Sequence, residues 1–276
     1  MTPQSNGELL PPHSAATPPP MPDYEREVSR PNSRERGWNI LATPGTYILL
    51  AVNIAVFGWM VLHGVSPKDP TTEQLIHYGA TNAGYILLGG QWWRLLTATF
   101  VHVGLLHIAT NMWCLWNLGL LGEPLLGPVG LIAVYLITGI AGNLLSLCAN
   151  VLPPHDFVAV GAGASGAVFG IAGILIVLLS NKKLPIPAFE LHRLRRSVIQ
   201  FAVLNLIIGY AANLTSIVRI DNHAHIGGFL SGLALGVPLL PRMTSGRTRY
   251  LQRQKLTFAA AAFLLFLFAY FIAKLR

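Results

Sequence analysis

The sequence predicts an all-α membrane protein with seven transmembrane helices, and three observations carry this prediction. Hydrophobic residues make up 53% of the 276 residues and charged residues only 11%, whereas soluble domains contain about 25% charged residues. The mean hydropathy is +0.52. Seven apolar segments, each long enough or nearly long enough to cross roughly 30 Å of hydrocarbon, alternate with polar and basic stretches. This pattern excludes a large soluble core.

Residues 1–43 precede the apolar segments and predict a disordered N-terminal tail. The tail is rich in Pro, Ser, Asn and charged residues, and it contains the run Pro18-Pro19-Pro20. Such a composition offers too little apolar surface to offset the entropy that is lost on ordering. We therefore expect the folded part of the chain to begin near residue 44.

The seven predicted helices follow this tail, and each is defined by its apolar run. Their expected spans are 47–62, 104–121, 128–150, 165–180, 197–214, 223–240 and 256–273. The fourth span is short for a full membrane crossing. We expect this helix to begin below the membrane surface and to leave room for water above it.

The positive charge of the chain indicates membrane topology rather than nucleic-acid binding. The net charge is +8, and most of the 19 Lys and Arg residues fall in three clusters, at 26–36, 182–196 and 242–255, on one side of the predicted helices. Lys and Arg are enriched in cytoplasmic loops. The pattern predicts a cytoplasmic N-terminus and an outer C-terminus. The basic stretch 182–196 would also favour anionic lipid.

Four polar side chains from three distant regions are predicted to lie at one depth. His107 and Asn111 follow the start of the second helix, Ser165 begins the fourth and His225 lies near the start of the sixth. With the predicted topology, all three helices start on the outer side, so the four side chains lie in the outer half of the membrane. Polar groups in hydrocarbon are costly and usually face a partner or a water-filled cavity. A single site is therefore expected.

Ser165 and His225 have the chemistry of a nucleophile and its base. Ser165 lies in the string Gly163-Ala164-Ser165-Gly166. A serine hydroxyl is a weak nucleophile until a base accepts its proton, and a histidine suits that role. At a helix N-terminus, the unpaired N–H groups and the helix dipole would also favour an oxyanion beside the serine. The alternative is that these glycines form only a small-residue packing face.

Helical phase favours His225 over His223 as the base. His225 lies on one narrow helix face with Gly228, Gly232 and Gly236. That face could approach the fourth helix closely, through Gly166, Gly170 and Gly173. His223 points roughly 200° away from this face or lies in the preceding loop. Asp221 could orient His225 as a triad acid, but its place in the loop favours exposure.

His107 and Asn111 are spaced i, i+4 and therefore share one face of the second helix. Both side chains can donate hydrogen bonds, as an oxyanion hole requires. An equally simple alternative is that they hydrogen-bond neighbouring helices. His102 falls off this face, so we expect it to be a structural residue of the loop or of the helix start.

The motifs together resemble those of the rhomboid intramembrane serine proteases. The resemblance covers about residues 47–240 and rests on five short motifs in the family's order. These are Trp93-Arg94, His107-x-x-x-Asn111, Gly119-x-x-x-Glu123-x-x-x-Gly127, Gly163-Ala164-Ser165-Gly166 and Ala224-His225-x-Gly227-Gly228. Each motif is short, but five in this order and spacing are highly specific.

The resemblance implies a Ser165–His225 dyad that works without a carboxylate. His107 and Asn111 would complete the oxyanion hole with the Ser165 N–H. Phe169 stands where some relatives carry a tyrosine stacked on the base, so it can stack but cannot donate a hydrogen bond. Transmembrane proteins are the expected substrates, the lipid bilayer is the expected surroundings, and no cofactor, metal or nucleic acid is expected.

The resemblance also divides the chain and places it in a cell. Residues 44–241 would form a six-helix catalytic core, and residues 242–276 a cytoplasmic basic linker and a seventh helix. We expect a multi-pass protein of a bacterial plasma membrane whose site opens to the outer side. Trp93 and Arg94 are expected to anchor the first outer loop at the lipid interface. Glu123, near the cytoplasmic end of its helix, is expected to bind loop backbone or nearby helices.

Two alternatives belong to other functional classes. One is a catalytically inactive rhomboid-like protein that binds client helices, although such proteins typically lack the serine or the histidine. The other is a metal or proton transporter that uses His102, His107, His223 and His225. Against it, no intramembrane carboxylate lies at the same depth, and the histidines are not spaced as ligands on one helix. The natural substrate and the oligomeric state do not follow from the sequence.

Overall fold

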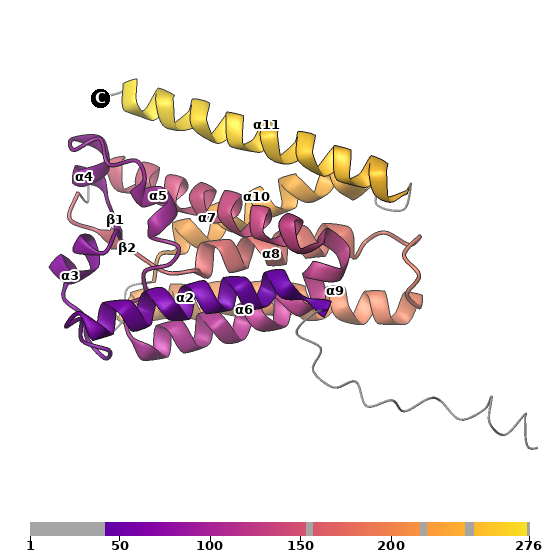
Figure 1. Ribbon diagram of the computed structural model, residues 1–276, viewed down its shortest axis with the longest axis horizontal. Coiled ribbons are helices and arrows are strands. Elements are labelled where there is room, and N and C mark those ends of the chain that lie inside the picture. Colours follow the sequence, from indigo (N-terminus) through magenta and orange to yellow (C-terminus); the bar gives the residue numbers. More distant parts are fainter. Residues whose placement is uncertain (1–41, 153–156, 216–219, 241–245, 275–276) are drawn as a thin grey trace, which may run out of the picture. The chain divides into compact units, whose positions relative to one another are not determined.

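The computed structural model describes residues 42–152, 157–215, 220–240 and 246–274. These residues form a bundle of long helices, with short helices and two short strands gathered at one end (Figure 1). We call this the strand end of the bundle. Most of the predicted tail, residues 1–41, lies outside the described residues.

Seven long helices occur in the described residues, and each overlaps one of the predicted spans. They are α2 (Pro44–Leu62), α6 (Leu105–Leu126), α7 (Pro128–Val151), α8 (Ser165–Leu178), α9 (Ala188–Thr215), α10 (Asn222–Leu239) and α11 (Arg247–Lys274). By length and composition, α2, α7, α9 and α11 could each cross a membrane, while α8 is a shorter apolar helix.

Two of these helices begin well before the apolar runs that predicted them. α9 starts at Ala188 rather than near residue 197, and α11 starts at Arg247 rather than near residue 256. The segment 247–255 was predicted as linker because it is polar and basic. Arg, Gln, Lys and Leu nevertheless have high helix propensity. An apolar run marks the part of a helix that lipid can cover, and the helix itself can extend beyond it.

α8 lies in the interior of the bundle. Every residue from Gly166 to Leu175 is buried, and the helix contacts α6, α7, α9 and α10. A helix that is apolar all round needs such surroundings. The helix that begins with Ser165 is therefore held on several sides by its neighbours.

Glycines allow α8 and α10 to touch through their backbones. A Cβ atom added at Gly228 would overlap the carbonyl oxygen of Gly166, and one at Gly232 would overlap that of Gly170. Gly173 lies in the same way against the Phe229 carbonyl. The predicted approach of these two glycine faces is confirmed. It brings the first turns of the two helices, and thus their polar residues, together.

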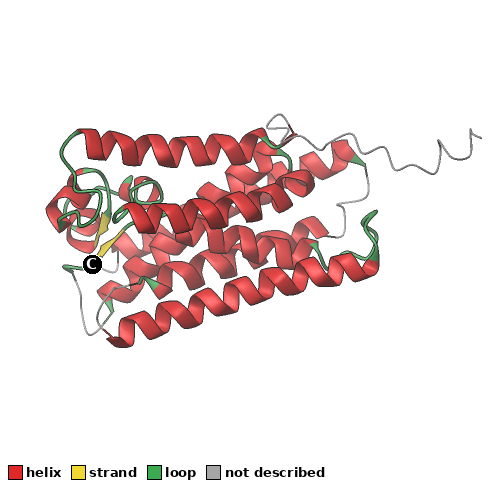
Figure 2. Cartoon of the chain, turned by 90° about the horizontal axis from the view of Figure 1, so that it is seen from below, coloured by secondary structure: helices red, strands yellow, loops and turns green. Residues whose placement is uncertain are grey.

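The segment between α2 and α6 contains more regular structure than the single outer loop that was predicted. Its elements are α3 (Thr72–His77), β1 (Thr81–Asn82), α4 (Ala83–Leu87) and α5 (Arg94–Thr97). β1 pairs in antiparallel fashion with β2 (Val160–Gly161) (Figure 2). This pairing ties the segment between α2 and α6 directly to the loop that precedes Ser165.

Arg94 was expected at the lipid interface together with Trp93, but it holds this segment together from inside. The side chain is buried, and its Nη1 donates to the carbonyl oxygens of Ile76 at 2.6 Å and Ala80 at 3.0 Å. Its Nε donates to Gln91 Oε1 at 2.7 Å. Trp93, by contrast, is 52% exposed, as an aromatic side chain at a lipid interface would be.

Glu123 binds the N-terminus of α2. Its Oε1 accepts from the Gly45 N–H at 2.8 Å, and its Oε2 accepts from the N–H and the hydroxyl of Thr46, both at 2.7 Å. Gly119, one turn earlier, leaves room for the Thr46 side chain. The carboxylate thus satisfies backbone donors that a helix N-terminus leaves unpaired and complements the helix dipole.

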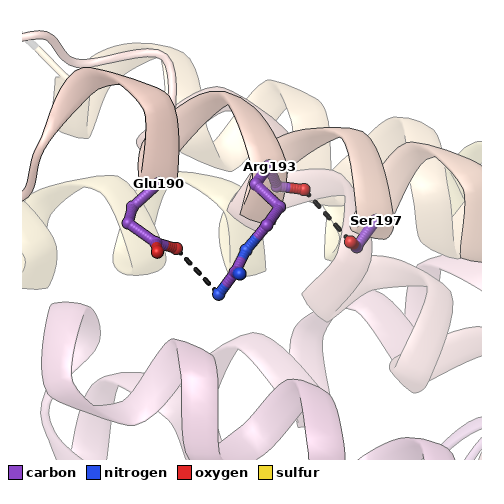
Figure 3. Close-up of polar contacts among 3 residues, drawn as sticks. All are labelled: Glu190, Arg193 and Ser197. Carbon is purple, nitrogen blue, oxygen red and sulfur yellow. Dashed lines mark hydrogen bonds and ion pairs between the residues drawn. The ribbon is translucent and has the colours of Figure 1, made fainter.

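The N-terminal part of α9 projects charged side chains to the surface. Arg193 Nη2 lies 2.9 Å from Glu190 Oε2, and the Arg193 carbonyl accepts from the Ser197 hydroxyl at 3.0 Å (Figure 3). Further along, the helix exposes large apolar side chains such as Leu204 and Ile207. A polar end followed by an exposed apolar surface suits a helix that emerges from lipid.

Candidate active site

Ser165 is the first residue of α8, at the strand end of the bundle. The preceding Gly163 has φ +127°, a conformation that L side chains rarely adopt. The Gly163 N–H donates to the Ala98 carbonyl at 2.9 Å, and β2 lies just before it. Ser165 is half-buried. A rigid turn therefore presents the hydroxyl at the start of an interior helix.

Beside that hydroxyl, the N-terminus of α8 has backbone N–H groups that lack a partner within the helix. The N-cap is Ala164, whose side chain cannot accept a hydrogen bond, and the first backbone bond of the helix joins the Val168 N–H to the Ala164 carbonyl at 2.9 Å. The N–H groups of the first turn therefore have no partner within the helix. Together with the helix dipole they favour a negative charge next to Ser165.

His225 lies in the first turn of α10, next to the first turn of α8. It is buried, and its ring stacks on that of Phe169, with centroids 4.5 Å apart and an interplanar angle of 16°. Phe169 is one turn along α8 from Ser165. Within the described residues, His225 Nδ1 has no hydrogen-bond partner, and no hydrogen bond joins the ring to the Ser165 hydroxyl. His223 is exposed instead.

Asp221 is the N-cap of α10. Its Oδ1 accepts from the Ala224 N–H at 3.0 Å, and its Oδ2 accepts from the Ser146 hydroxyl at 2.5 Å. Both carboxylate oxygens are therefore engaged away from the imidazole of His225. In this arrangement Asp221 fixes the start of the helix that carries His225, which is a different task from that of a triad acid.

His107 faces the loop that precedes Ser165. Its Nδ1 accepts from the Val103 N–H at 3.2 Å, so the neutral ring carries its proton on Nε2. A Cβ atom added at Gly163 would lie 2.6 Å from His107 Cε1 and 2.9 Å from Nε2. The glycine therefore makes room for the ring, and an N–H donor lies beside the turn that carries Ser165.

Asn111 lies one turn further along the same helix face as His107. The side chain is buried, and Nδ2 donates to the carbonyl oxygen of His107 at 2.9 Å. An amide nitrogen carries two hydrogens, so this bond orients the group and uses only one of them.

His102 is closer to the site than its sequence position indicated. The side chain is fully buried; Nδ1 lies 3.1 Å from the Phe100 carbonyl, and Nε2 accepts from the Ala164 N–H at 3.4 Å. The ring thus holds the peptide unit just before Ser165. Its structural role was predicted, but its contact with the serine loop was not, because loop contacts follow no helical period.

The histidines do not form a metal centre in the part of the chain that the structure describes. No group of three or more His, Cys, Asp or Glu side chains there could hold a metal ion. The rings of His102 and His107 do lie near each other, with centroids 5.4 Å apart. Their contacts to Ala164 and Val103 account for that proximity.

Comparison with known proteins identifies the family. Residues 89–242 match the family model of the Rhomboid domain. The chain is 35% identical over 198 residues to Rhomboid protease GluP of Bacillus subtilis, covering 70% of this chain and 35% of that protein. It is 31% identical over 207 residues to Rhomboid protease AarA of Providencia stuartii, covering 70% of this chain and 71% of that one.

A plant relative extends the comparison. RHOMBOID-like protein 7 of Arabidopsis thaliana is 33% identical over 176 residues, which cover 64% of this chain and 51% of the relative. The chain thus spans between a third and about half of the length of GluP and of this plant protein. The match to the Rhomboid domain, together with the long apolar helices, shows that the chain is an integral membrane protein of the rhomboid family.

Proposed function

We propose that the chain is an intramembrane serine endopeptidase that hydrolyses peptide bonds within or beside transmembrane segments of other proteins. The observation that carries the proposal is that two rings from other helices lie at the N-terminus of α8, where Ser165 begins the helix. The His225 ring stacks on Phe169, and the His107 ring lies against Gly163. The names of GluP and AarA, both called rhomboid proteases, support it.

In the first step, Ser165 Oγ attacks the scissile carbonyl while His225 takes the hydroxyl proton. The imidazolium then gives this proton to the leaving amine, and an acyl-enzyme remains on Ser165. A water molecule releases the acyl group by the reverse proton route. The two side chains share no hydrogen bond in the described residues, so this bond would have to form in the substrate complex; catalytic hydrogen bonds often tighten only when substrate is present.

The oxyanion would be held by three donors of different kinds. These are the Ser165 N–H at the unpaired end of α8, the His107 Nε2–H beside Gly163, and the second N–H of the Asn111 amide. Removal of one such donor typically costs about 10²–10³-fold in kcat. Local contacts to backbone groups hold the His107 ring and the Asn111 amide, which would limit the reorganisation needed during the reaction.

Phe169 holds the base by stacking alone. The near-parallel contact with His225 fixes the plane of the imidazole, but a phenyl ring donates no hydrogen bond. The ring is also 5.9 Å from that of Phe201 on α9. The base therefore relies on packing between α8, α9 and α10.

The topology is part of the proposal. All seven long helices would cross the membrane, with residues 44–241 as the catalytic core and residues 242–276 as the linker and seventh helix. The N-terminus would be cytoplasmic, because the basic clusters lie on that side. The strand end, with Ser165, would open to the outer side of a bacterial plasma membrane and admit water from there.

The substrate segment must unwind before it is cut. A carbonyl inside a regular helix is hydrogen-bonded and shielded, and in lipid that bond is strongly maintained. Small or helix-weakening residues are therefore expected near the cut site. Gly163 and Gly166 flank the nucleophile closely, which favours a small residue just before the scissile bond.

Co-expression with a transmembrane reporter substrate tests the proposal. Ser165→Ala and His225→Ala should each abolish cleavage while the protein still inserts at wild-type levels, and His223→Ala should retain cleavage because its ring is exposed. Cleavage by the Ser165→Ala variant would refute the proposed mechanism.

One observation favours a second candidate, a rhomboid-like protein that binds client helices without cutting them. It is the missing hydrogen bond between Ser165 and His225 in the described residues. This candidate predicts that the wild type and Ser165→Ala bind and traffic a client equally, with no fragments in either case. The appearance of Ser165-dependent fragments rules it out.

A further inference from the structure

A groove lies between α11 and the helices α7 and α10. It encloses about 590 Å³, within the range of about 300–1,000 Å³ typical of ligand sites. Most of its lining is apolar, including Ile137, Pro238, Ala260, Leu264 and Phe268. The polar lining residues are Ser231, Thr257 and Arg253; Arg253 carries the one charge and lies in the second turn of α11.

α11 is held against the bundle near both of its ends. Near the start of the helix, the Tyr250 hydroxyl donates to the Leu125 carbonyl at 3.1 Å and Gln254 Nε2 donates to the Leu126 carbonyl at 2.8 Å. At the strand end, Ile272 packs in a cluster with Ile86 and Leu147. Between these attachments, small residues such as Ala234 and Ala260 line the gap.

Among the residues that the structure describes, none provides a counter-ion for Arg253. Its Nε is buried and lacks a hydrogen-bond partner among the described residues, and α7, α10 and α11 contain no Asp or Glu. Arg193 differs in this respect, because it pairs with Glu190 at the exposed start of α9 (Figure 3). A half-buried guanidinium without an acid needs an anion from elsewhere.

We propose that this groove binds one anionic phospholipid. The phosphate group would pair with the guanidinium of Arg253, and an acyl chain would lie along α11 toward Phe268. The distance from Arg253 to Phe268 along the helix is about 22 Å at 1.5 Å per residue. One leaflet of hydrocarbon is roughly 15 Å thick. The groove is therefore long enough for one acyl chain.

The position of the charge favours a lipid over a protein helix as occupant. Basic residues cluster around the start of α11, at Arg247, Arg249, Arg253 and Lys255, where juxtamembrane Lys and Arg attract anionic headgroups. The charge lies at one end of the mostly apolar groove, which matches an amphiphile that has one polar end.

Native mass spectrometry of the purified full-length protein tests the proposal. The protein in neutral detergent is titrated with dioleoyl-phosphatidylglycerol or with dioleoyl-phosphatidylcholine, and the first bound lipid is quantified. The wild type should prefer phosphatidylglycerol by at least about five-fold, the effect of one basic residue near a headgroup. Arg253→Gln should lose this preference. Arg249→Gln, which removes an exposed charge outside the groove, should keep it.

A second pair of variants tests the acyl-chain site without changing charge. Ala260→Trp fills the groove and should reduce binding of both lipids, whereas Ala259→Trp changes a neighbour that does not line it and should not. Equal binding of the two lipids by the wild type, or unchanged preference in Arg253→Gln, would overturn the proposal. Displacement of the lipid by a second copy of the chain would also overturn the proposal. Ser165→Ala should bind lipid as the wild type does. The lipid-binding result therefore does not depend on whether the proposed catalytic function is correct.

Discussion

Gly232→Ala on α10 is expected to impair catalysis from two turns away. The added methyl group would overlap the carbonyl oxygen of Gly170 on α8, where carbon and oxygen atoms need a separation of about 3.3 Å. The two helices must then move apart by on the order of 1 Å. Overpacking of this kind costs roughly 1–3 kcal/mol of stability.

The activity should fall further than the stability, because Ser165 and His225 are carried on the two helices that separate. A misplacement of about 1 Å can cost on the order of 10²-fold in rate. We expect kcat for a reporter substrate to fall by about that factor, with a smaller change in KM. The assay measures cleavage by purified protein in detergent, alongside the thermal unfolding midpoint.

Gly58→Ala on α2 is the matched control. A Cβ atom there meets no atom within 4 Å, and alanine is favoured over glycine in a helix by roughly 0.5–1 kcal/mol. This variant should keep full activity and unfold at the same or a higher temperature. Wild-type kcat in Gly232→Ala, with the protein folded, would refute the claim that close packing of α8 and α10 positions the dyad.

Three further predictions follow from the site and its support. Single variants His107→Ala and Asn111→Ala should each lower kcat by about 10²–10³-fold with little change in KM, because each removes a donor to the oxyanion; an unchanged kcat in both would remove them from the mechanism. Phe169→Ala should lower kcat while Phe169→Tyr retains it, since either aromatic ring can stack on His225; the comparison is made at saturating substrate, and equal rates in Phe169→Ala and the wild type would count against a role for stacking. Glu123→Gln should lower the free energy of unfolding by about 1.5–3 kcal/mol, the value of a hydrogen bond to a charged group. The amide N–H group of glutamine cannot accept a hydrogen bond from the donors at the start of α2. Denaturant titration measures the change, and unaltered stability would contradict this role of Glu123.

Much of the helix bundle could be predicted from the sequence, because helices that lipid surrounds must be apolar over most of their length. Each apolar run predicted a helix, and the glycine period on α8 and α10 predicted the face through which they meet. The phase of His225 relative to His223 likewise separated a buried ring from an exposed one. In each case a helical period of 3.6 residues carried the information.

The structure of the segment between α2 and α6 could not be predicted from such a period. Strands of two residues, such as β1 and β2, have no detectable alternation, and α4 and α5 are too short to show a helical period. The local signals are the capping box of Thr71 and Gln74 at the start of α3 and the N-cap Asn82 at the start of α4. The contacts of His102 with Ala164 and of Arg94 with loop carbonyls depend on how distant loops meet.

The most direct test of the central claim is covalent labelling of Ser165 by a fluorophosphonate, with the modified residue located by peptide mass spectrometry. The account predicts one adduct, on Ser165, that is lost in Ser165→Ala and strongly slowed in His225→Ala, because an unactivated hydroxyl reacts poorly. An adduct at another residue, or labelling of Ser165 at the same rate without His225, would contradict a serine nucleophile activated by this histidine.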